Sequence, residues 1–150
     1  MRGPQVMKGY LNNPDATRNS IDEDGFFHSG DIGHVDEHDE FFIVDRLKEL
    51  IKYKGFQVAP AELEALLLTH PKVADVAVIG VADEEGGEAP KAFVVSKEPV
   101  SAEEIMEFVA ARVAPHKKVR RVEFVEQIPK SATGKILRRV LRDKEKAAAR

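Results

Sequence analysis

The stretch Val73-Ala74-Asp75-Val76-Ala77-Val78-Ile79-Gly80-Val81 decides the fold of this chain. It is rich in β-branched residues and carries a single charge near its start, a pattern that predicts a buried β-strand. Glu85-Gly86-Gly87-Glu88 follows as a turn, and Ala92-Phe93-Val94-Val95 predicts the returning strand. These two strands indicate a sheet around which the neighbouring segments must pack.

A helical pattern lies on each side of these strands along the chain. Residues 60–70 predict a short helix with leucines on one face, closed by Pro71. After the strands, Ser101 is placed to cap a second helix, and Glu104, three residues later, completes a capping box. We therefore expect two helices to flank the sheet.

The last third of the chain predicts one more strand and one more helix. Residues 119–125 predict a strand in which Val122 and Phe124 alternate with charged residues. The final helix is predicted over 136–146, and its inward candidates are Ile136 and Val140, with Leu137 and Leu141 as further ones. Because strands and helices alternate around a small sheet, the fold class is α+β.

Residues 1–44 differ from the rest in being rich in Gly, Asn and Asp. Asn13-Pro14 predicts a helix start, with proline at the first helical position. An acidic turn over 35–40 separates two short apolar strands, which predicts a hairpin. The apolar side chains here exceed what two strands can bury. We expect residues 1–45 to be the end of a larger domain and residues 46–150 to be a separate domain.

Composition sets the broad class of the protein. With 150 residues, 43% hydrophobic and 33% charged, the chain fits one globular domain, or one domain plus part of another. The absence of Cys excludes disulfides and thiolate metal sites, and the five His form no metal-binding pattern. No apolar run approaches the roughly 18 residues of a membrane span, and no apolar signal core starts the chain. We expect a cytoplasmic protein without a metal site and without a membrane partner.

Charge is distributed unevenly along the chain. The net charge is −3, but residues 112–150 carry 13 Lys or Arg against 4 Asp or Glu, a net +9, and residues 1–111 carry 10 against 22, a net −12. A basic end suggests an anionic partner, either a phosphorylated small molecule or a nucleic acid. The last helix interleaves acids with bases and has no aromatic residue for base stacking, which argues against nucleic acid. A solvated basic face is the alternative for Arg138, Arg139 and Arg142.

One run near the end of the chain carries a candidate catalytic lysine. Pro129-Lys130-Ser131-Ala132-Thr133-Gly134-Lys135-Ile136-Leu137-Arg138 places Lys135 at the tip of a glycine-containing turn before a helix. A P-loop would need G-x-x-x-x-G-K-[ST], but Pro129 replaces the first glycine and Ile136 replaces the Ser or Thr. From this run alone, an ordinary turn before a basic surface helix is an equally good interpretation.

Three further runs precede it in a fixed order. They are Gly3-Pro4-Gln5-Val6-Met7-Lys8-Gly9-Tyr10-Leu11-Asn12-Asn13-Pro14, Phe26-Phe27-His28-Ser29-Gly30-Asp31, and the charged stretch over 44–58 continued by 60–64. Together with the Lys135 run, they resemble the C-terminal part of the adenylate-forming enzymes: acyl- and aryl-CoA synthetases, firefly luciferase and peptide-synthetase adenylation domains. The likeness is strongest to the branch of 4-coumarate–CoA ligases and luciferase, and it covers essentially the whole chain.

This resemblance implies a fold and a reaction. Residues 46–150 would be the small C-terminal lid domain, and residues 1–45 the end of the large N-terminal adenylation domain. The parent enzyme would be an ATP-dependent acyl- or aryl-CoA ligase that converts a carboxylic acid and ATP to acyl-AMP, then transfers the acyl group to CoA. The implied cofactors are ATP/AMP, CoA and Mg²⁺, and the implied partner is the N-terminal adenylation domain. Alone, the chain should be inactive.

The resemblance also assigns residues to the first step. Lys135 matches the family's adenylation lysine, and its chemistry is suitable because a carboxylate must approach the anionic α-phosphate of ATP. A flexible ammonium between them offsets the charge that builds up in the transition state. Asp31 and Arg46 match the residues that contact the AMP ribose. Without the resemblance, an Asx-turn role for Asp31 would be favoured.

For the second step, the resemblance points to the linker and the loop after it. Lys48 matches the hinge on which the lid rotates. Lys52, Lys54, Gly55 and Gln57 belong to the loop that enters the active site for thioester formation. There, Gly55 would line the pantetheine tunnel, while Lys52 and Gln57 would act near the phosphate and the nucleotide. An ordinary surface ion-pair segment and a solvated hairpin are the alternatives.

Two other functions remain open at this point. One is a free-standing module that binds nucleotide or CoA, or that complements a separate N-terminal domain. The other is a small basic nucleic-acid-binding α+β domain. A weaker inference is that the basic residues His116, Lys117, Lys118, Arg120 and Arg121 meet the phosphates of CoA.

Overall fold

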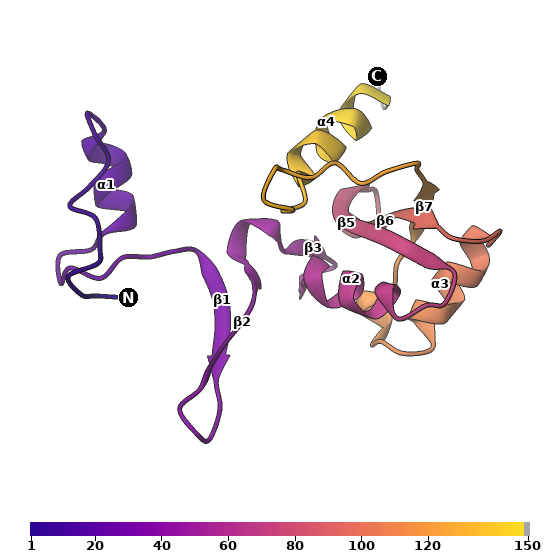
Figure 1. Cartoon of the computed structure of the whole chain (residues 1–150), viewed down its shortest axis with the longest axis horizontal. Helices are drawn as coiled ribbons and strands as arrows, with labels where there is room; N and C mark the ends of the chain where they lie inside the picture. The colour runs from indigo at the N-terminus through magenta and orange to yellow at the C-terminus, as the bar shows by residue number, and fades with distance from the viewer. Residues whose placement is uncertain (149–150) are drawn as a thin grey trace. The chain divides into compact units, whose positions relative to one another are not determined.

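The computed structural model describes residues 1–148 and divides into two compact units, Met1–Lys48 and Glu49–Arg150 (Figure 1). The division follows Lys48, three residues beyond the predicted boundary between residues 45 and 46. The last two residues of the second predicted domain lie outside the described ones. Each unit is an independent cluster of contacts.

The first unit contains one helix and one hairpin, as predicted. Helix α1 (Pro14–Ser20) begins after Asn13, whose side-chain oxygen accepts a hydrogen bond of 3.0 Å from the Ala16 amide. This cap and the proline in the first turn explain the helix start. Strands β1 (Asp31–Val35) and β2 (Phe41–Arg46) pair antiparallel on either side of the acidic turn.

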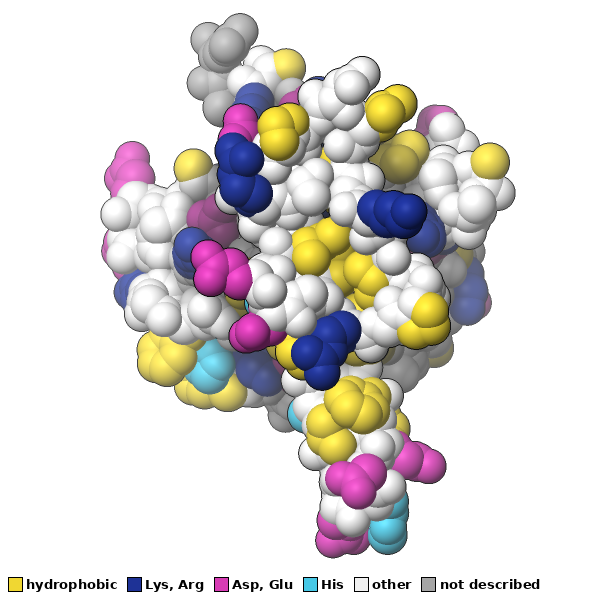
Figure 2. Space-filling model, turned by 90° about the vertical axis from the view of Figure 1, so that its left-hand side faces the viewer, with side chains coloured by type: hydrophobic (Ala, Val, Ile, Leu, Met, Phe, Trp, Pro, Cys, Tyr) yellow, Lys and Arg dark blue, Asp and Glu magenta, His cyan; other side chains and the backbone are white. Residues whose placement is uncertain are grey.

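This first unit has no core of its own. None of its residues, from 1 to 48, is buried. Phe41 is 80% exposed, and its neighbours in β2 are also accessible. Figure 2 shows hydrophobic side chains along the hairpin and acidic side chains at its tip. A two-stranded ribbon and one short helix bury too little apolar surface to be stable in isolation.

The second unit is built on a five-stranded sheet. Its strands are β3 (Ile51–Tyr53), β4 (Phe56–Val58), β5 (Val73–Asp83), β6 (Gly87–Ser96) and β7 (Arg121–Phe124). The order is β4-β3-β6-β5, with β7 pairing β6 in parallel. Its α-helices are α2 (Pro60–Leu68), α3 (Ala102–Ala110) and α4 (Arg138–Ala148). It also contains the short 3₁₀ turn η2 (Pro115–Lys117). A second 3₁₀ turn, η1 (Leu47–Glu49), leads into this unit. The predicted α+β class is confirmed.

Strand β5 is covered on both faces, which explains its continuous apolar sequence. Val76 and Val78 belong to the core cluster that includes residues of α2 and α3, whereas Ala77 and Ile79 belong to a second cluster that includes Leu141 of α4. Alternate side chains of a strand point to opposite faces, so the two clusters lie on opposite faces of β5. The stretch that decided the fold therefore lies at the centre of the core.

The prediction for the inward face of α4 was partly wrong. Leu141 is buried at 4% exposure, but Val140 is 51% exposed and Leu137 also lies in solvent. The helix begins at Arg138 rather than at 136, and Ile136 pairs with Lys130 in an isolated bridge before it. Around Leu141, the inner face of α4 carries charged residues that form ion pairs with the rest of the unit. A prediction from the apolar pattern alone therefore misplaced the inner face of this helix.

Strand β7 shows a related difference. Phe124, one of the two apolar residues in the predicted alternation, is exposed, whereas the charged Glu123 is partly buried. The Glu123 carboxylate accepts hydrogen bonds from Lys91 at 2.7 Å and from Lys144 at 2.6 Å, and these contacts draw it inward. Val122 packs against the apolar core on one face of this short strand, and ion pairs hold Glu123 on the other face.

The predicted capping box of α3 forms only on one side. The Ser101 hydroxyl accepts a hydrogen bond of 3.1 Å from the Glu104 amide. The Glu104 carboxylate instead lies 2.8 and 3.0 Å from the Lys72 ammonium. A tertiary ion pair has replaced the local return bond that a capping box would make.

Candidate functional site

Asp31 and Arg46, the two predicted ribose-contact residues, lie opposite each other. They are cross-strand partners at the end of the β1–β2 hairpin, and Arg46 Nε donates to Asp31 Oδ1 over 3.2 Å. Two residues 15 positions apart thus meet because strand pairing brings them together. The Asp31 carboxylate binds across the strand pair, while its own amide donates to Ser29 Oγ, so an Asx-turn role does not describe its main contact.

Lys48, the predicted hinge, lies in the 3₁₀ turn η1 immediately after β2. The ladder of the hairpin ends there, with the Leu47 amide donating to the Gly30 carbonyl over 2.8 Å. Hinges are formed by a few residues at the ends of elements, which is the position Lys48 occupies. The assignment as a hinge stays a prediction.

The four loop residues predicted for the second step form one tight hairpin. Lys52 and Gln57 are cross-strand partners in β3 and β4, and both are exposed. Lys54 and Gly55 form the two-residue turn, with φ values of 48° and 82°. Two consecutive positive φ values are the mark of a type I′ turn, which favours glycine at the second position. Positive φ, rather than close packing, is why Gly55 is a glycine, since a Cβ added there would meet no other atom within 4 Å.

The turn between β5 and β6, together with the first residues of β6, holds this hairpin in place. Glu88 Oε2 accepts a hydrogen bond of 2.9 Å from the Lys52 amide, and the Gly86 carbonyl accepts one of 2.9 Å from the Lys54 amide. A hydrogen bond from the Lys54 ammonium to Glu85 raises the pKa of Lys54. Sequence reasoning interpreted these residues only as a turn. In the sequence, the carboxylates of Glu85 and Glu88 on either side of Gly86-Gly87 were the feature that could have indicated this contact.

Lys135 lies at the exposed tip of a closed turn. The Leu137 amide donates to the Pro129 carbonyl and the Ser131 amide to the Lys135 carbonyl, both over 2.8 Å. Gly134, with φ 79°, makes the reversal possible. Within residues 1–148 no side chain pairs with the Lys135 ammonium. The turn is a small hairpin, not the strand–loop–helix of a P-loop, as the two sequence mismatches predicted.

The structure brings the predicted residues together in three groups: Asp31 with Arg46, the β3–β4 hairpin, and the Lys135 turn. The last two belong to the same unit. Among the described residues, no hydrogen bond or ion pair joins Lys135 to the hairpin. The Lys135 turn and the β3–β4 hairpin are therefore two separate, exposed, lysine-bearing loops of the same unit.

The basic residues proposed to meet CoA phosphates are largely engaged inside the unit. The Lys117 ammonium binds both carboxylate oxygens of Glu62 at 2.8 Å, and the Arg120 guanidinium lies 3.8 Å from the centre of the Tyr53 ring. The His116 ring stacks on Phe56 with centroids 4.4 Å apart. The role in CoA binding stays a prediction.

The basic helix α4 is mostly not a free anion-binding face. Arg138 pairs with Glu64 and Arg142 pairs with Glu49. Only Arg139 fits a solvated face, being 93% exposed and paired loosely with Asp143. The alternative interpretation of these arginines as a solvated face is therefore wrong for Arg138 and Arg142.

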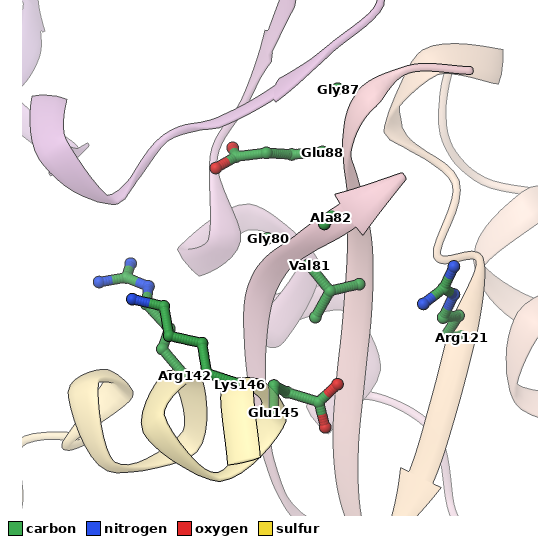
Figure 3. A pocket seen from close by; sticks show the side chains of 9 residues that line it. All are labelled: Gly80, Val81, Ala82, Gly87, Glu88, Arg121, Arg142, Glu145 and Lys146. Atoms are coloured by element: carbon green, nitrogen blue, oxygen red, sulfur yellow. The ribbon is translucent and has the colours of Figure 1, made fainter. Parts of the chain in front are cut away.

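A cavity of about 470 Å³ lies between the β5–β6 hairpin and α4 (Figure 3). Three of its charged side chains are already paired within the unit: Glu88 binds the Lys52 amide, Glu145 binds Lys91 at 2.5 Å, and Arg142 binds Glu49. Its lining includes Arg121, one of the basic residues proposed to meet CoA phosphates, and Arg142 of α4, but no residue of the three groups described above. This cavity is the seam along which α4 joins the sheet.

Neither a membrane helix nor a metal centre is present in the described part of the chain. None of the helices in residues 1–148 combines the length and apolar character that crossing a bilayer requires. In the same residues no three His, Asp or Glu side chains gather as metal ligands.

Comparison with known proteins agrees with this arrangement. A family model described as AMP-binding enzyme C-terminal domain matches residues 62–135. The 4-coumarate–CoA ligase of Pinus taeda is 58% identical over 144 residues, and 4-coumarate–CoA ligase 1 of Oryza sativa subsp. japonica is 61% identical over 145 residues. These matches cover 96% and 95% of this chain but only 27% and 26% of the relatives.

Solved structures show the same relation. ATP-bound MatB from Rhodopseudomonas palustris has a TM-score of 0.92 at 33% identity, covering 99% of this chain and 30% of that one. The o-succinylbenzoate CoA synthetase of Bacillus subtilis, in complex with its acyl-adenylate intermediate, has a TM-score of 0.86 at 36% identity, covering 95% and 29%. The chain spans less than a third of these proteins. It belongs to the adenylate-forming enzymes and carries their AMP-binding C-terminal domain.

Proposed function

We propose that this chain is the C-terminal part of an ATP-dependent acyl- or aryl-CoA ligase. The observation that carries the proposal is the identity of about 60% to 4-coumarate–CoA ligases over nearly the whole chain. Those relatives are roughly four times as long, so the complete reaction belongs to a larger protein. A carboxylic acid, ATP and CoA are the substrates that this assignment implies.

The first step forms an acyl-adenylate. An oxygen of the substrate carboxylate attacks the α-phosphorus of ATP, the bond to the β-phosphate bridging oxygen breaks, and diphosphate leaves. Mg²⁺ would accompany the ATP. The Lys135 ammonium, exposed and unpaired within residues 1–148, is available to lie between the two anions. An ammonium placed there stabilises the transition state more than the separated reactants.

The nucleotide would be held in part by the first unit. Arg46 engages Asp31 Oδ1, and among the described residues Asp31 Oδ2 has no partner. A carboxylate oxygen in this state can accept hydrogen bonds from ribose hydroxyls, while the half-exposed Arg46 fixes its orientation. The Asp31 carboxylate is therefore an acceptor suited to the ribose of AMP.

In the second step the CoA thiol attacks the acyl carbonyl, the acyl–phosphate bond breaks, and AMP leaves. The β3–β4 hairpin would serve this step, with Gly55 beside the pantetheine arm and Lys52 and Gln57 near the phosphate. Rotation about Lys48 would move the Lys135 turn out of the active site and bring this hairpin into it. The two exposed loops on one unit support such an exchange, because a single rigid body can present either.

The partner of the chain would be the N-terminal adenylation domain. The first unit, without a buried residue, supports this partner, because its exposed apolar strand β2 needs further polypeptide to cover it. The phosphate-binding loop and the acyl pocket would lie in that domain. Alone, the chain would release no AMP from ATP and an acid.

A chimera tests the proposal directly. This chain would be joined to the part of the Pinus taeda ligase that lies outside the matched 27%. With 4-coumarate, ATP and CoA, we expect thioester formation that falls about 100-fold in Lys135→Ala, the size of losing one transition-state donor. Lys97→Ala, at an exposed lysine outside the site, is the matched control. An active chimera in which Lys135→Ala changes nothing would refute the role of Lys135.

The alternative, a free-standing nucleotide- or CoA-binding module, predicts binding without the larger domain. Calorimetric titration of the chain with AMP and with CoA would reveal it. A nucleic-acid-binding role is disfavoured by the paired arginines of α4, and steeply salt-dependent binding to RNA or DNA would be needed to restore it.

A further inference from the structure

Both arms of the Lys135 turn are tied to the free edge of β5. This strand ends the order β4-β3-β6-β5, so it has a strand partner on one side only. Edge strands present unpaired backbone groups that proteins must cover. Charged side chains lie along this edge of β5. Two of them, Lys130 and Arg138, belong to the segments that enter and leave the Lys135 turn.

The arm that leaves the turn is held by a nearly buried ion pair. Arg138 Nη2 donates to Glu64 Oε2 over 2.6 Å, and the two side chains are only 17% and 10% exposed. Glu64 Oε1 accepts the amide of Val78 on β5 over 2.8 Å, and Arg138 Nε lies 3.4 Å from the Val78 carbonyl. One carboxylate and one guanidinium therefore close the edge at Val78.

The arm that enters the turn is held by a second ion pair, which is more exposed than the first. The Lys130 ammonium lies 2.6 Å from Asp75 Oδ2, and Asp75 Oδ1 accepts the Val76 amide over 3.0 Å. Lys130 also forms the isolated bridge with Ile136 that closes the base of the turn. The turn is thus anchored on β5 at two points, through Asp75 and through Glu64.

We propose that Arg138 with Glu64, and Lys130 with Asp75, are positioning residues that hold the Lys135 turn in one orientation; the catalytic part of this inference rests on the proposed function. Beyond these anchors, the turn has its own hydrogen bonds and the side chain of Ile136, which packs against the core cluster around Ile79 and Leu141. A tip that carries a catalytic ammonium must be placed to well under 1 Å, because small displacements reduce rates steeply. The planar fork of Arg138, bonded while nearly buried, is suited to fixing such a placement.

The order of the turn can be measured without any activity. In the ¹⁵N-labelled 150-residue chain, we expect backbone order parameters of Gly134 and Lys135 to fall from about 0.85 to below about 0.6 in Arg138→Met and in Lys130→Met. The matched control is Arg139→Met, at the neighbouring, exposed arginine, where no change is expected. If Arg138→Met unfolds the chain, the more exposed Lys130→Met decides. Folded variants with an unchanged turn would overturn the proposal.

The catalytic part is tested in the chimera by separating the two half-reactions. We expect Arg138→Met to lower kcat for ATP–diphosphate exchange at least tenfold, with an unchanged KM for ATP. Thioester formation from preformed coumaroyl-AMP should stay within twofold. Equal losses in both half-reactions would indicate a general structural role and overturn the proposal, as would no loss in either. A chimera inactive in both half-reactions would instead count against the proposed function, while the order parameters still decide on the anchors.

Discussion

At the scale of single residues, the buried charge of Glu64 has the largest structural consequence. It lies on α2 but binds a backbone amide of β5 and the guanidinium of Arg138 from α4. Three elements therefore depend on one carboxylate. Such a group is costly to bury alone and is stabilised only by partners that complete its hydrogen bonds.

We expect Glu64→Ala to lower the free energy of unfolding by about 3 kcal/mol, because it leaves a nearly buried guanidinium and a strand amide without their acceptor. Urea denaturation followed by circular dichroism measures this change. Glu98→Ala, at an exposed acid, provides the comparison and should cost under about 0.5 kcal/mol. A loss for Glu64→Ala as small as that of the control would show that the pair contributes little.

Substitutions at two glycines, Gly86 and Gly55, distinguish a steric clash from backbone strain as the cause of lost stability. A Cβ at Gly86 would lie 2.4 Å from the Tyr53 ring, whereas at Gly55 the space is open but φ is 82°. We expect Gly86→Ala to cost about 1–3 kcal/mol through overpacking and Gly55→Ala about 1 kcal/mol through strain. Thermal unfolding of both variants checks this, and the reverse order would contradict the packing around Tyr53.

At the scale of elements, charged contacts join β6, β7 and α4. Lys91 on β6 binds Glu123 of β7 and Glu145 of α4, and Lys144 binds Glu123 from the other side. Hydrogen bonds from Lys144 and Lys91 lower the pKa of Glu123. Burial acts to lower the pKa of Lys91, but its hydrogen bonds to Glu123 and Glu145 outweigh burial and raise it.

These shifts predict the pH range over which α4 is held. A lowered carboxyl pKa stabilises the fold above the ordinary value of 4.5, and this stabilisation is lost as pH falls through the folded-state pKa. The raised pKa of Lys91 stabilises the fold below 10.5 and is lost only at higher pH. We expect Glu123→Gln to weaken the decline in stability between about pH 5 and pH 3. Urea midpoints across that range measure it, and parallel curves for variant and wild type would refute the prediction.

At the scale of the whole molecule, the two units differ in how they are stabilised. The second has two apolar clusters around its sheet, and the first has no buried residue. Local stability follows buried apolar contacts. We therefore expect the second unit to unfold cooperatively and the first unit to be weakly structured until a partner covers its hairpin.

Amide hydrogen exchange of the isolated chain tests this difference. We expect amides of residues 1–48 to exchange within minutes, and those of the β5–β6 pair, such as Val76 and Phe93, to be protected by orders of magnitude more. Limited proteolysis should cut first within the first unit. Strong, uniform protection across residues 1–40 would contradict the view that this unit requires further polypeptide.

Local chemistry in the sequence was enough to predict the position and type of most elements. The run at Val73–Val81, the proline after Asn13 and the glycine at 55 act over a few residues, so their effects can be predicted without the fold. The resemblance to adenylate-forming enzymes, carried by ordered motifs, was likewise visible in the sequence and is confirmed by the comparisons.

Tertiary structure alone decided which charged residues are buried and which apolar ones are exposed. Arg138 meets Val78 and Glu64 across 60 and 74 positions of sequence, and no local pattern encodes such a pairing. For the same reason Val140 lies in solvent while charged neighbours take the inner face of α4. Apolar periodicity marks a surface to be covered, but ion pairing depends on which distant carboxylate the fold brings within reach.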